Sequence, residues 1–330
     1  MTNSNSFGNK FKKAIVTGGA GFVGSHLVED LLQEGLNVIS LDDYSAGKEE
    51  NLAHLRDMYP DKFQEVKCDV TNYQQLREHF SGVDIVFHQA CSKMTICLKD
   101  PRRDLAINAE GTFNMLELSK EFGVKKFVHA STGSVYGKAQ YYPTDETHPL
   151  NPASYYGVSK LAGEKYVRAF SDLYDLNTSI LRYYHIYGSR QESSDVGGVV
   201  SIFARRALED KELIIYGDGS QVRSFTFVKD VVNINKIVAV SEGTKGEAYN
   251  CASGISVTIK QLAEKVLQSL GKEHLPIVYK DWKIGDIKEF NVSNKKIHDL
   301  GFNFKYLNFD EGLDETLSWS KSWYENTDKR

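Results

Sequence analysis

The chain has 330 residues, of which 41% are hydrophobic and 25% are charged, and its formal net charge is −4. These values are typical of a globular protein with two domains, or with one large domain and a cap. The slightly acidic balance argues against nucleic acid or an anionic membrane as a partner. The N-terminal residues lack the apolar core of a signal peptide and no apolar stretch reaches the roughly 20 residues of a membrane span, so we expect a cytoplasmic protein.

Short apolar runs alternate with helical patterns from the N-terminus to beyond the middle of the chain. The apolar runs cover 14–16, 37–41, 84–87, 126–129 and 178–181, and the helical patterns include 25–33, 106–121 and 154–174. This alternation predicts an α/β protein with a doubly wound parallel sheet. Because the regularity fades after residue 182, we predict a first domain over 1–182 and a smaller lobe over 183–330, with part of 224–250 returning to the first domain.

A glycine-rich segment, TGGAGFVG at 17–24, follows the first strand and opens the first helix. Gly19, Gly21 and Gly24 match the G-x-G-x-x-G spacing, and Gly18 adds another permissive position. Such glycines allow a tight turn and bring the backbone close to a pyrophosphate, which the free N–H groups of the helix N-terminus bind. The segment therefore predicts a dinucleotide site.

Carboxylates follow the next two strands. The second strand ends in Asp42, where a carboxylate accepts hydrogen bonds from the adenosine ribose and repels a 2′-phosphate. Asp43 comes next and no arginine is adjacent to the pair in the sequence, so NAD is favoured over NADP. Asp69 and Val70 follow the third strand pattern. Asp69 either faces the adenine amino group or caps a helix over 72–80.

A tyrosine and a lysine lie four residues apart in the helical segment YYGVSK. This spacing places Tyr156 and Lys160 on one face of the helix. A nearby ammonium and the positive nicotinamide would lower the pKa of the phenol from about 10 toward neutrality, which would make it a general base. The segment ASTGSVYG at 130–137 adds the hydroxyls of Ser131, Thr132 and Ser134 but no acid.

Cysteines give no sign of a metal site. The four of them are scattered without a CxxC pair, at Cys68, Cys91, Cys97 and Cys251. Their spacing suits neither a zinc site nor a redox motif, so we expect reduced thiols and no metal.

Taken together, these motifs resemble the extended short-chain dehydrogenase/reductase family, in particular its nucleotide-sugar epimerases and dehydratases. The segments that carry the resemblance, in order, are TGGAGFVG, INAEGT, STGSVYG, YYGVSK, LRYYHIYG, IYGDGSQVRSF and KIGDI. The resemblance extends from about Phe11 to the C-terminus. It implies a Rossmann-type NAD-binding domain, a nucleotide-sugar-binding lobe, NAD as cofactor, a UDP-hexose as substrate and a homodimer.

The resemblance also assigns roles to residues. Tyr156 would take the proton of a sugar 4-hydroxyl, Lys160 would hold the nicotinamide ribose, and Thr132 would hydrogen-bond the same sugar oxygen. The implied cofactor-binding residues are Gly18, Gly21, Phe22, Val23, Gly24, Asp42, Asp43, Asp69, Val70, Gln89, Ala90, Lys93, Asn108, Tyr156, Lys160 and Tyr184. The implied substrate-binding residues are Lys93, Thr132, Ser134, Tyr156, His185, Arg223, Lys283, Asp286 and Phe290.

The pair Gly133-Ser134 separates the reactions that the family catalyses. Dehydratases of the family carry Asp-Glu at these positions, and decarboxylating relatives carry a Glu at the second. Without an acid, elimination lacks its proton shuttle, whereas oxidation and re-reduction at C4 lack nothing. A 4-epimerase is therefore favoured. A dehydratase with acids from elsewhere, a 4-keto reductase and a non-catalytic NAD-binding protein remain alternatives.

Several positions depart from the family pattern or bear on the substrate. His185 replaces the usual Asn, Ser189 the usual Pro, and Lys283 a second clamp Arg. Phe290 either fills the space beside the sugar C2, which would favour UDP-glucose and UDP-galactose over N-acetylated sugars, or turns into the core of its own lobe. Glu192 would oppose a uronate carboxylate.

The resemblance places the dimer interface on the helices over 106–121 and 154–174. Their apolar residues are numerous enough to supply an outward stripe, although burial in the core explains them equally well. These residues are Met115, Leu116, Leu118, Leu161, Val167 and Phe170.

Overall fold

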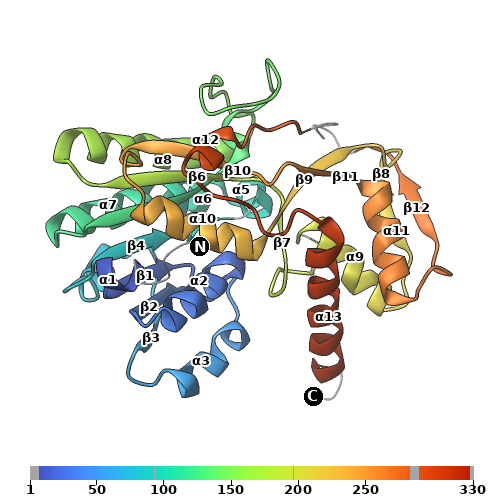
Figure 1. Ribbon diagram of the computed structural model, residues 1–330, viewed down its shortest axis with the longest axis horizontal. Helices are drawn as coiled ribbons and strands as arrows, with labels where there is room; N and C mark the ends of the chain where they lie inside the picture. Colours follow the sequence, from blue (N-terminus) through green and yellow to red (C-terminus); the bar gives the residue numbers. More distant parts are fainter. Residues whose placement is uncertain (1–6, 93, 196, 283–289, 328–330) are drawn as a thin grey trace.

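A seven-stranded parallel sheet forms the centre of the molecule (Figure 1). The computed structural model describes residues 7–92, 94–195, 197–282 and 290–327. The strand order is β10-β6-β5-β4-β1-β2-β3. The strands are β1 (Lys13–Thr17), β2 (Asn37–Asp42), β3 (Phe63–Lys67), β4 (Ile85–His88), β5 (Lys126–Thr132), β6 (Thr178–Tyr183) and β10 (Glu247–Cys251). The predicted α/β class with a doubly wound parallel sheet is confirmed.

The strands are apolar on both faces because helices cover both sides of the sheet. In β1, Ala14 and Val16 pack into one hydrophobic cluster and Ile15 into the opposite one. The first cluster includes residues of α2 (Phe22–Gln33), α3 (Ala53–Met58), α10 (Val228–Val240) and α12 (Lys295–Asp299), with α1 (Phe7–Lys10) beside them. The second includes residues of α4 (Tyr73–Arg77), α7 (Gly111–Glu121) and α8 (Tyr155–Tyr174).

Helix α8 carries the predicted Tyr-Lys pair and has well-defined ends. The Ser154 side chain accepts a hydrogen bond from the Gly157 N–H at 3.1 Å, which caps the N-terminus. The helix ends where Asp175 adopts the left-handed conformation, with φ 60°. Short elements flank α7 and α8: α5 (Met94–Lys99), α6 (Pro101–Leu105), η2 (Ala106–Glu110) and η3 (Gly133–Val135).

A second lobe packs around its own hydrophobic cluster beside the large sheet (Figure 1). Its helices are α9 (Val199–Leu208), α11 (Ile259–Leu270) and α13 (Phe309–Thr327). Its strands are β7 (Ile186–Tyr187), β8 (Leu213–Tyr216), β9 (Val222–Phe227), β11 (Ile255–Thr258) and β12 (Ile277–Lys280). The chain returns to the large sheet through α10 and β10, which extend from 228 to 251 and overlap the range 224–250 that the sequence assigns to the first domain. One further turn, η1 (Glu49–Asn51), lies between β2 and α3.

The apolar residues named for an outward stripe on α7 and α8 belong mostly to the core. Met115, Leu116, Leu118 and Val167 are fully buried, and Phe170 is 5% exposed. These side chains pack toward the sheet in the second cluster, so the outward-stripe interpretation of them is wrong. The exposed apolar surface of these helices consists of other residues: Phe113, Tyr155, Val158, Tyr166, Leu173 and Tyr174.

Within the described residues, no helix combines the length and the apolar character needed to cross a membrane.

Candidate active site

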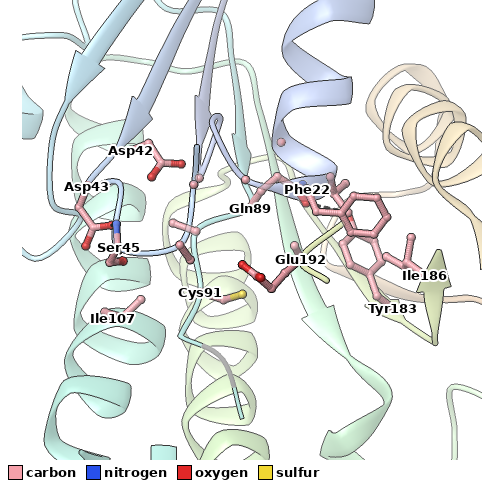
Figure 2. Close-up of a pocket in the computed structure, with 18 of the residues that line it drawn as sticks. Phe22, Asp42, Asp43, Ser45, Gln89, Cys91, Ile107, Tyr183, Ile186 and Glu192 are labelled. Atoms are coloured by element: carbon pink, nitrogen blue, oxygen red, sulfur yellow. Dashed lines mark hydrogen bonds between the residues drawn. The ribbon is translucent and has the colours of Figure 1, made fainter. Parts of the chain in front are cut away.

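A cavity of about 600 Å³ lies where the strands of the large sheet end. Gly18 follows β1, Asp42 ends β2, Gln89 follows β4, Thr132 ends β5 and Tyr183 ends β6, and all five line the cavity. Because the strands are parallel, their carboxyl ends meet at one edge, where α/β proteins bind ligands. Figure 2 shows a carboxylate-rich end at Asp42 and an aromatic end at Tyr183.

The glycine-rich turn forms the floor of this cavity. Gly18 has φ 64°, in the left-handed region, and its N–H donates to the Leu41 carbonyl at 2.7 Å. A Cβ on Gly24 would lie 2.0 Å from the Gly18 oxygen, so no larger residue fits where the turn meets α2. Gly21 provides the N-cap of α2 without a side chain that caps the N–H groups. The backbone N–H groups at the start of α2 can therefore donate hydrogen bonds to a pyrophosphate.

Asp42 is fixed by backbone donors at the other end of the cavity. Its carboxylate accepts hydrogen bonds from the Ala20 N–H at 2.9 Å and the Tyr44 N–H at 2.8 Å. Burial raises the pKa of Asp42 although these donors oppose the shift. A Cβ on Gly47 would lie 2.7 Å from a carboxylate oxygen of Asp42, so the loop after β2 passes directly over it.

Asp69 also lines the cavity but does not cap a helix. The N-cap of α4 is Asn72, whose side chain accepts a hydrogen bond from the Gln75 N–H at 3.2 Å, so the capping interpretation of Asp69 is wrong. The Asp69 carboxylate instead accepts hydrogen bonds from the Thr71 N–H and hydroxyl, at 2.9 and 2.8 Å. Asp69 is therefore available to the cavity as an acceptor.

An arginine lies beside these carboxylates in space, although none is adjacent in the sequence. Arg103 on α6 donates from Nη2 to Asp69 at 2.7 Å and to Asp43 at 3.1 Å. Burial alone would raise the pKa of Asp69, but hydrogen bonds from Thr71 and Arg103 outweigh it and lower that pKa. No arginine is adjacent to Asp42 and Asp43 in the sequence, but α6 packs beside the strand ends and brings Arg103 to Asp43.

Tyr156, Lys160 and Thr132 converge at the other side of the cavity. The Thr132 side chain is close enough to the Tyr156 phenol to favour its ionised form, and the Thr132 hydroxyl contacts Ser134 Oγ at 3.2 Å. Lys160 is 1% exposed and its Nζ donates to the Ala130 carbonyl at 2.5 Å. Burial raises the pKa of Tyr156 and lowers that of Lys160. In the protein alone the pKa of Tyr156 is therefore raised, whereas the sequence predicted that Lys160 and the nicotinamide would lower it.

A buried carboxylate from α8, Glu164, lies beside the hydroxyls of the strand end. Ser131, which lines the cavity, donates to the Glu164 carboxylate at 2.5 Å. Arg182 donates from Nε and Nη2 to the same carboxylate at 3.0 and 2.8 Å, and both side chains are 1% exposed. Glu164 lies four residues after Lys160 and therefore on the same face of α8. This spacing could have identified Glu164 from the sequence. A buried bidentate ion pair holds this acid in place.

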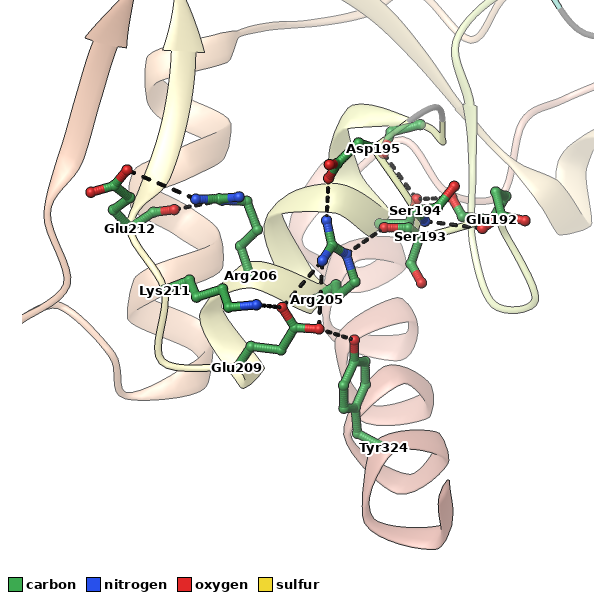
Figure 3. Close-up of polar contacts among 12 residues, drawn as sticks. Glu192, Ser193, Ser194, Asp195, Arg205, Arg206, Glu209, Lys211, Glu212 and Tyr324 are labelled. Atoms are coloured by element: carbon green, nitrogen blue, oxygen red, sulfur yellow. Dashed lines mark hydrogen bonds and ion pairs between the residues drawn. The ribbon is translucent and has the colours of Figure 1, made fainter. Parts of the chain in front are cut away.

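The loop after β7 closes the cavity from the second lobe, and Arg205 on α9 anchors it (Figure 3). Arg205 donates to the Ser193 carbonyl at 2.7 Å and to the Asp195 carboxylate at 2.5 Å. Glu209 pairs with Arg205 at 3.1 Å and accepts a hydrogen bond from the Tyr324 hydroxyl of α13 at 3.0 Å. The lobe's helices therefore position the loop that carries Glu192 into the cavity.

His185 also lines the cavity, whereas Phe290 is outside its lining. The two rings are in edge contact, with centroids 4.7 Å apart. Burial lowers the pKa of His185 to about 3, and its Nδ1 is buried without a partner. The Arg223 guanidinium lies over the Phe290 ring at 5.3 Å.

Some predicted residues do not line the cavity. Asn108 is buried behind it and donates to Ser92 and Ser159 at 3.1 and 3.0 Å. Tyr184 is 4% exposed and points away, while its neighbour Tyr183 lines the cavity, so the strand presents the other tyrosine to the cofactor side. Ser134 and Arg223 are also absent from the lining, and Lys93, Lys283 and Asp286 lie outside the described residues.

The remaining predicted positions all line the cavity. They are Gly21, Phe22, Val23, Gly24, Asp43, Val70, Gln89, Ala90 and, as described above, Gly18, Asp42, Asp69, Thr132, Tyr156, Lys160 and His185. No cluster of three or more histidine, cysteine, aspartate or glutamate side chains suited to a metal occurs in the described part of the chain.

Comparison with known proteins agrees with this geometry. The profile of the NAD dependent epimerase/dehydratase family matches residues 14–252. The UDP-glucose 4-epimerase of Mycolicibacterium smegmatis is 34% identical over 315 residues, which are 94% of this chain and 99% of that protein. The structure of a UDP-glucose 4-epimerase from Thermotoga maritima with UDP-glucose superposes with a TM-score of 0.88 at 34% identity, covering 94% of this chain and 99% of that one.

A relative with a different reaction is nearly as similar. The dTDP-glucose 4,6-dehydratase of Streptomyces venezuelae, solved with NAD, has a TM-score of 0.87 at 30% identity and covers 96% of this chain and 98% of its own. The chain belongs to the NAD-dependent epimerase/dehydratase family, as the sequence motifs indicated, and it is an enzyme of that family with NAD as its cofactor.

Proposed function

We propose that this enzyme is a UDP-sugar 4-epimerase that interconverts UDP-hexoses, with UDP-glucose and UDP-galactose as its preferred pair. The observation that carries the proposal lies beside Thr132. A Cβ on Gly133 would lie 2.4 Å from Cε1 of Tyr184, well inside the closest approach that real Cβ atoms make. The position where dehydratases of the family carry their first acid is therefore closed by an aromatic ring.

The acid nearest to the hydroxyls is also committed elsewhere. Glu164 receives two hydrogen bonds from Arg182 and one from Ser131, and it is 1% exposed. Protonating this carboxylate would leave the buried guanidinium without its counter-charge, which costs about 3–5 kcal/mol for a buried pair. Glu164 is therefore a structural anion and is not available to remove a proton from C5.

Reversible oxidation at C4 needs a hydride acceptor and one side chain that takes and returns a proton. When bound, NAD supplies the hydride acceptor and donor for C4 of the sugar. Tyr156 takes the proton of the 4-hydroxyl as C4 is oxidised and returns it when the ketone is reduced, so the protons balance without another acid. Thr132 hydrogen-bonds the phenol and the reacting oxygen, and it orients both.

The lining supports a neutral hexose without an N-acetyl group. Phe290 is outside the cavity lining but packs against His185, which lines it, so a 2-acetamido group that displaced His185 would meet the Phe290 ring. Glu192 adds a carboxylate to the lining, which opposes a uronate. These two residues favour UDP-glucose and UDP-galactose over acetylated and acidic sugars.

We also propose that the enzyme is a homodimer that pairs through α7 and α8. Phe113 of α7 and Tyr166 of α8 are 36% and 42% exposed and contact each other edge to face, with centroids 5.3 Å apart. Leu173 extends this apolar ridge at 72% exposure. Such a surface is typical of a helix-bundle interface. Light scattering at micromolar concentration should give the mass of a dimer, and the mass of a monomer would overturn this proposal.

Product analysis tests the function directly. The protein is incubated with UDP-glucose, and the products are identified by NMR, with Tyr156→Phe as the inactive control. We expect UDP-galactose. A 4-keto-6-deoxy sugar would identify a dehydratase, a released UDP-4-keto-glucose with one NADH formed for each sugar oxidised would identify a 4-keto reductase running in reverse, and no product in the NAD-loaded protein would identify a binding protein.

A further inference from the structure

Arg103 joins two carboxylates that line the same end of the cavity but come from different strands. Its Nη2 donates to Asp69 Oδ2 at 2.7 Å and to Asp43 Oδ2 at 3.1 Å. Asp43 follows β2 and Asp69 follows β3, whereas Arg103 is on α6. One nitrogen atom therefore connects the loops after β2 and β3.

The helix that carries Arg103 is itself fixed. The Asp100 side chain accepts a hydrogen bond from the Arg103 N–H at 3.0 Å and caps α6, and Pro101 occupies its first position. Arg103 is about one-third exposed, so its ion pairs are neither fully buried nor free in solvent.

The second oxygen of each carboxylate is held as well. Asp43 Oδ1 accepts hydrogen bonds from the Ser45 N–H at 2.9 Å and the Ser45 hydroxyl at 2.6 Å. Asp69 Oδ1 accepts the equivalent pair from Thr71. Each side chain is thus held at both oxygens, by its own turn on one side and by Arg103 on the other. Lone pairs of both carboxylates remain for a ligand in the cavity.

We infer that Arg103 is a positioning residue that sets the selectivity of the site for the adenine base of its cofactor. The inference rests on the placement of adenosine at the end lined by Asp42, Asp69 and Val70. There, Asp69 would accept a hydrogen bond from the exocyclic amino group of adenine. Arg103 keeps that carboxylate ionised and aimed, and it offsets the repulsion between Asp69 and Asp43.

Without Arg103, two like charges face each other across the adenine end of the cavity. Asp69 Oδ2 would then turn away from Asp43 toward solvent, which misplaces the acceptor for the amino group. Affinity for a base with an amino group would fall more than affinity for a base without one. A residue that only stabilised the fold would weaken both equally.

The test compares NAD with nicotinamide hypoxanthine dinucleotide, in which a carbonyl oxygen replaces the adenine amino group. The full-length protein is equilibrated with an equimolar excess of both dinucleotides. Bound nucleotide is then separated by rapid gel filtration and quantified by chromatography. The ratio of the two bound species gives the base selectivity independently of catalytic activity.

We expect the wild-type protein to retain NAD over the hypoxanthine analogue by on the order of 10-fold, the value of one charge-assisted hydrogen bond. Arg103→Met should reduce the ratio to about 2-fold or less, and Arg103→Lys should give an intermediate ratio because an ammonium lacks the planar fork. Arg77→Met is the matched control. Arg77 pairs with Glu121 between α4 and α7, outside the cavity lining, so its loss should leave the ratio unchanged.

Two results would overturn the inference. If the wild-type protein bound both dinucleotides equally, adenosine would not lie against Asp69. If the wild-type protein were selective but Arg103→Met and Arg103→Lys kept the wild-type ratio while the total nucleotide bound per chain stayed normal, Arg103 would have no positioning role.

Discussion

Tyr184 occupies the space into which a side chain at position 133 would project. The nearest ring atoms lie 2.4 and 2.5 Å from a Cβ built on Gly133. Tyr184 is 4% exposed and packs in a small cluster with Val135, Tyr136 and Ala252, so the ring has little room to withdraw. The glycine beside Thr132 is thus required by packing, and the same packing excludes an acid there.

Gly133→Ala should therefore lower the free energy of unfolding by about 1–3 kcal/mol through overpacking. In a Tyr184→Ala background, the same substitution should cost much less because the clash is gone. Urea denaturation of the four proteins in this cycle measures the coupling. Equal costs of Gly133→Ala in both backgrounds would show that the two residues do not compete for space.

Tyr156→Phe should lower kcat by at least ~10²–10⁴-fold, since it removes the proposed general base. Tyr155→Phe is the matched control, because the adjacent Tyr155 is 61% exposed and does not line the cavity. Thr132→Ala should cost about 10–10³-fold, the value of one preorganised hydrogen bond. Steady-state kinetics give kcat for each variant, and the bound NAD is quantified so that a loss of activity is not a loss of cofactor. Near-normal turnover by Tyr156→Phe would refute the assignment.

Two buried histidines beneath Lys160 should make the protein sensitive to acid. His88 and His129 are fully buried and stacked, with centroids 5.5 Å apart, and neither nitrogen of His129 has a partner. Burial lowers the pKa of His88 to about 3 and that of His129 well below 6.5. The unfolded chain therefore binds more protons than the folded one below pH 6.5, and stability is lost as the pH falls.

Each histidine should contribute about 1.4 kcal/mol of lost stability per pH unit below pH 6.5. Replacing His129 by Leu should make the fall in unfolding free energy between pH 6.5 and pH 5 shallower by about that amount per unit. The exposed His274 provides the control, and His274→Leu should leave the slope unchanged. Identical slopes for His129→Leu and the wild type would contradict the argument.

The sequence predicted the parts of the structure that depend on local pattern. Strands such as β1 and β5 were recognisable because they are apolar on both faces, and the glycine turn was recognisable by its spacing. Contacts between distant segments were not predictable. Arg103 reaches Asp69 only because α6 packs beside the ends of β2 and β3, and no local pattern reports that contact.

The assignment of Tyr184 to the cofactor illustrates a second limit. Adjacent residues at a strand end point to opposite sides, so an error of one position exchanges a cavity residue for a core residue. Tyr183 ends β6 and lines the cavity, whereas Tyr184 packs over Gly133. On α7 and α8 the number of apolar residues left open whether they lay in the core or on an outward stripe, and the structure places Met115 and Val167 in the core.

Phe290 should limit the size of the sugar that the site accepts. If the ring fills the space beside C2, the wild-type kcat/KM should favour UDP-glucose over UDP-N-acetylglucosamine by about 5- to 150-fold, the equivalent of ~1–3 kcal/mol of overpacking. Phe290→Ser should reduce this preference by raising kcat/KM for the acetylated sugar. A wild-type preference for UDP-N-acetylglucosamine with no gain in Phe290→Ser would show that Phe290 is not the gate.

The central claim is that the site oxidises and re-reduces C4 and does not eliminate water from the sugar. Incubation of the NAD-loaded protein with UDP-glucose in D₂O, followed by NMR of the recovered sugar nucleotides, tests it most directly. Because the hydride stays within the site and Glu164 is not available to remove a proton from C5, we predict a mixture of UDP-glucose and UDP-galactose without deuterium at C4, C5 or C6. A 4-keto-6-deoxy product, or deuterium at C5 or C6, would contradict the account.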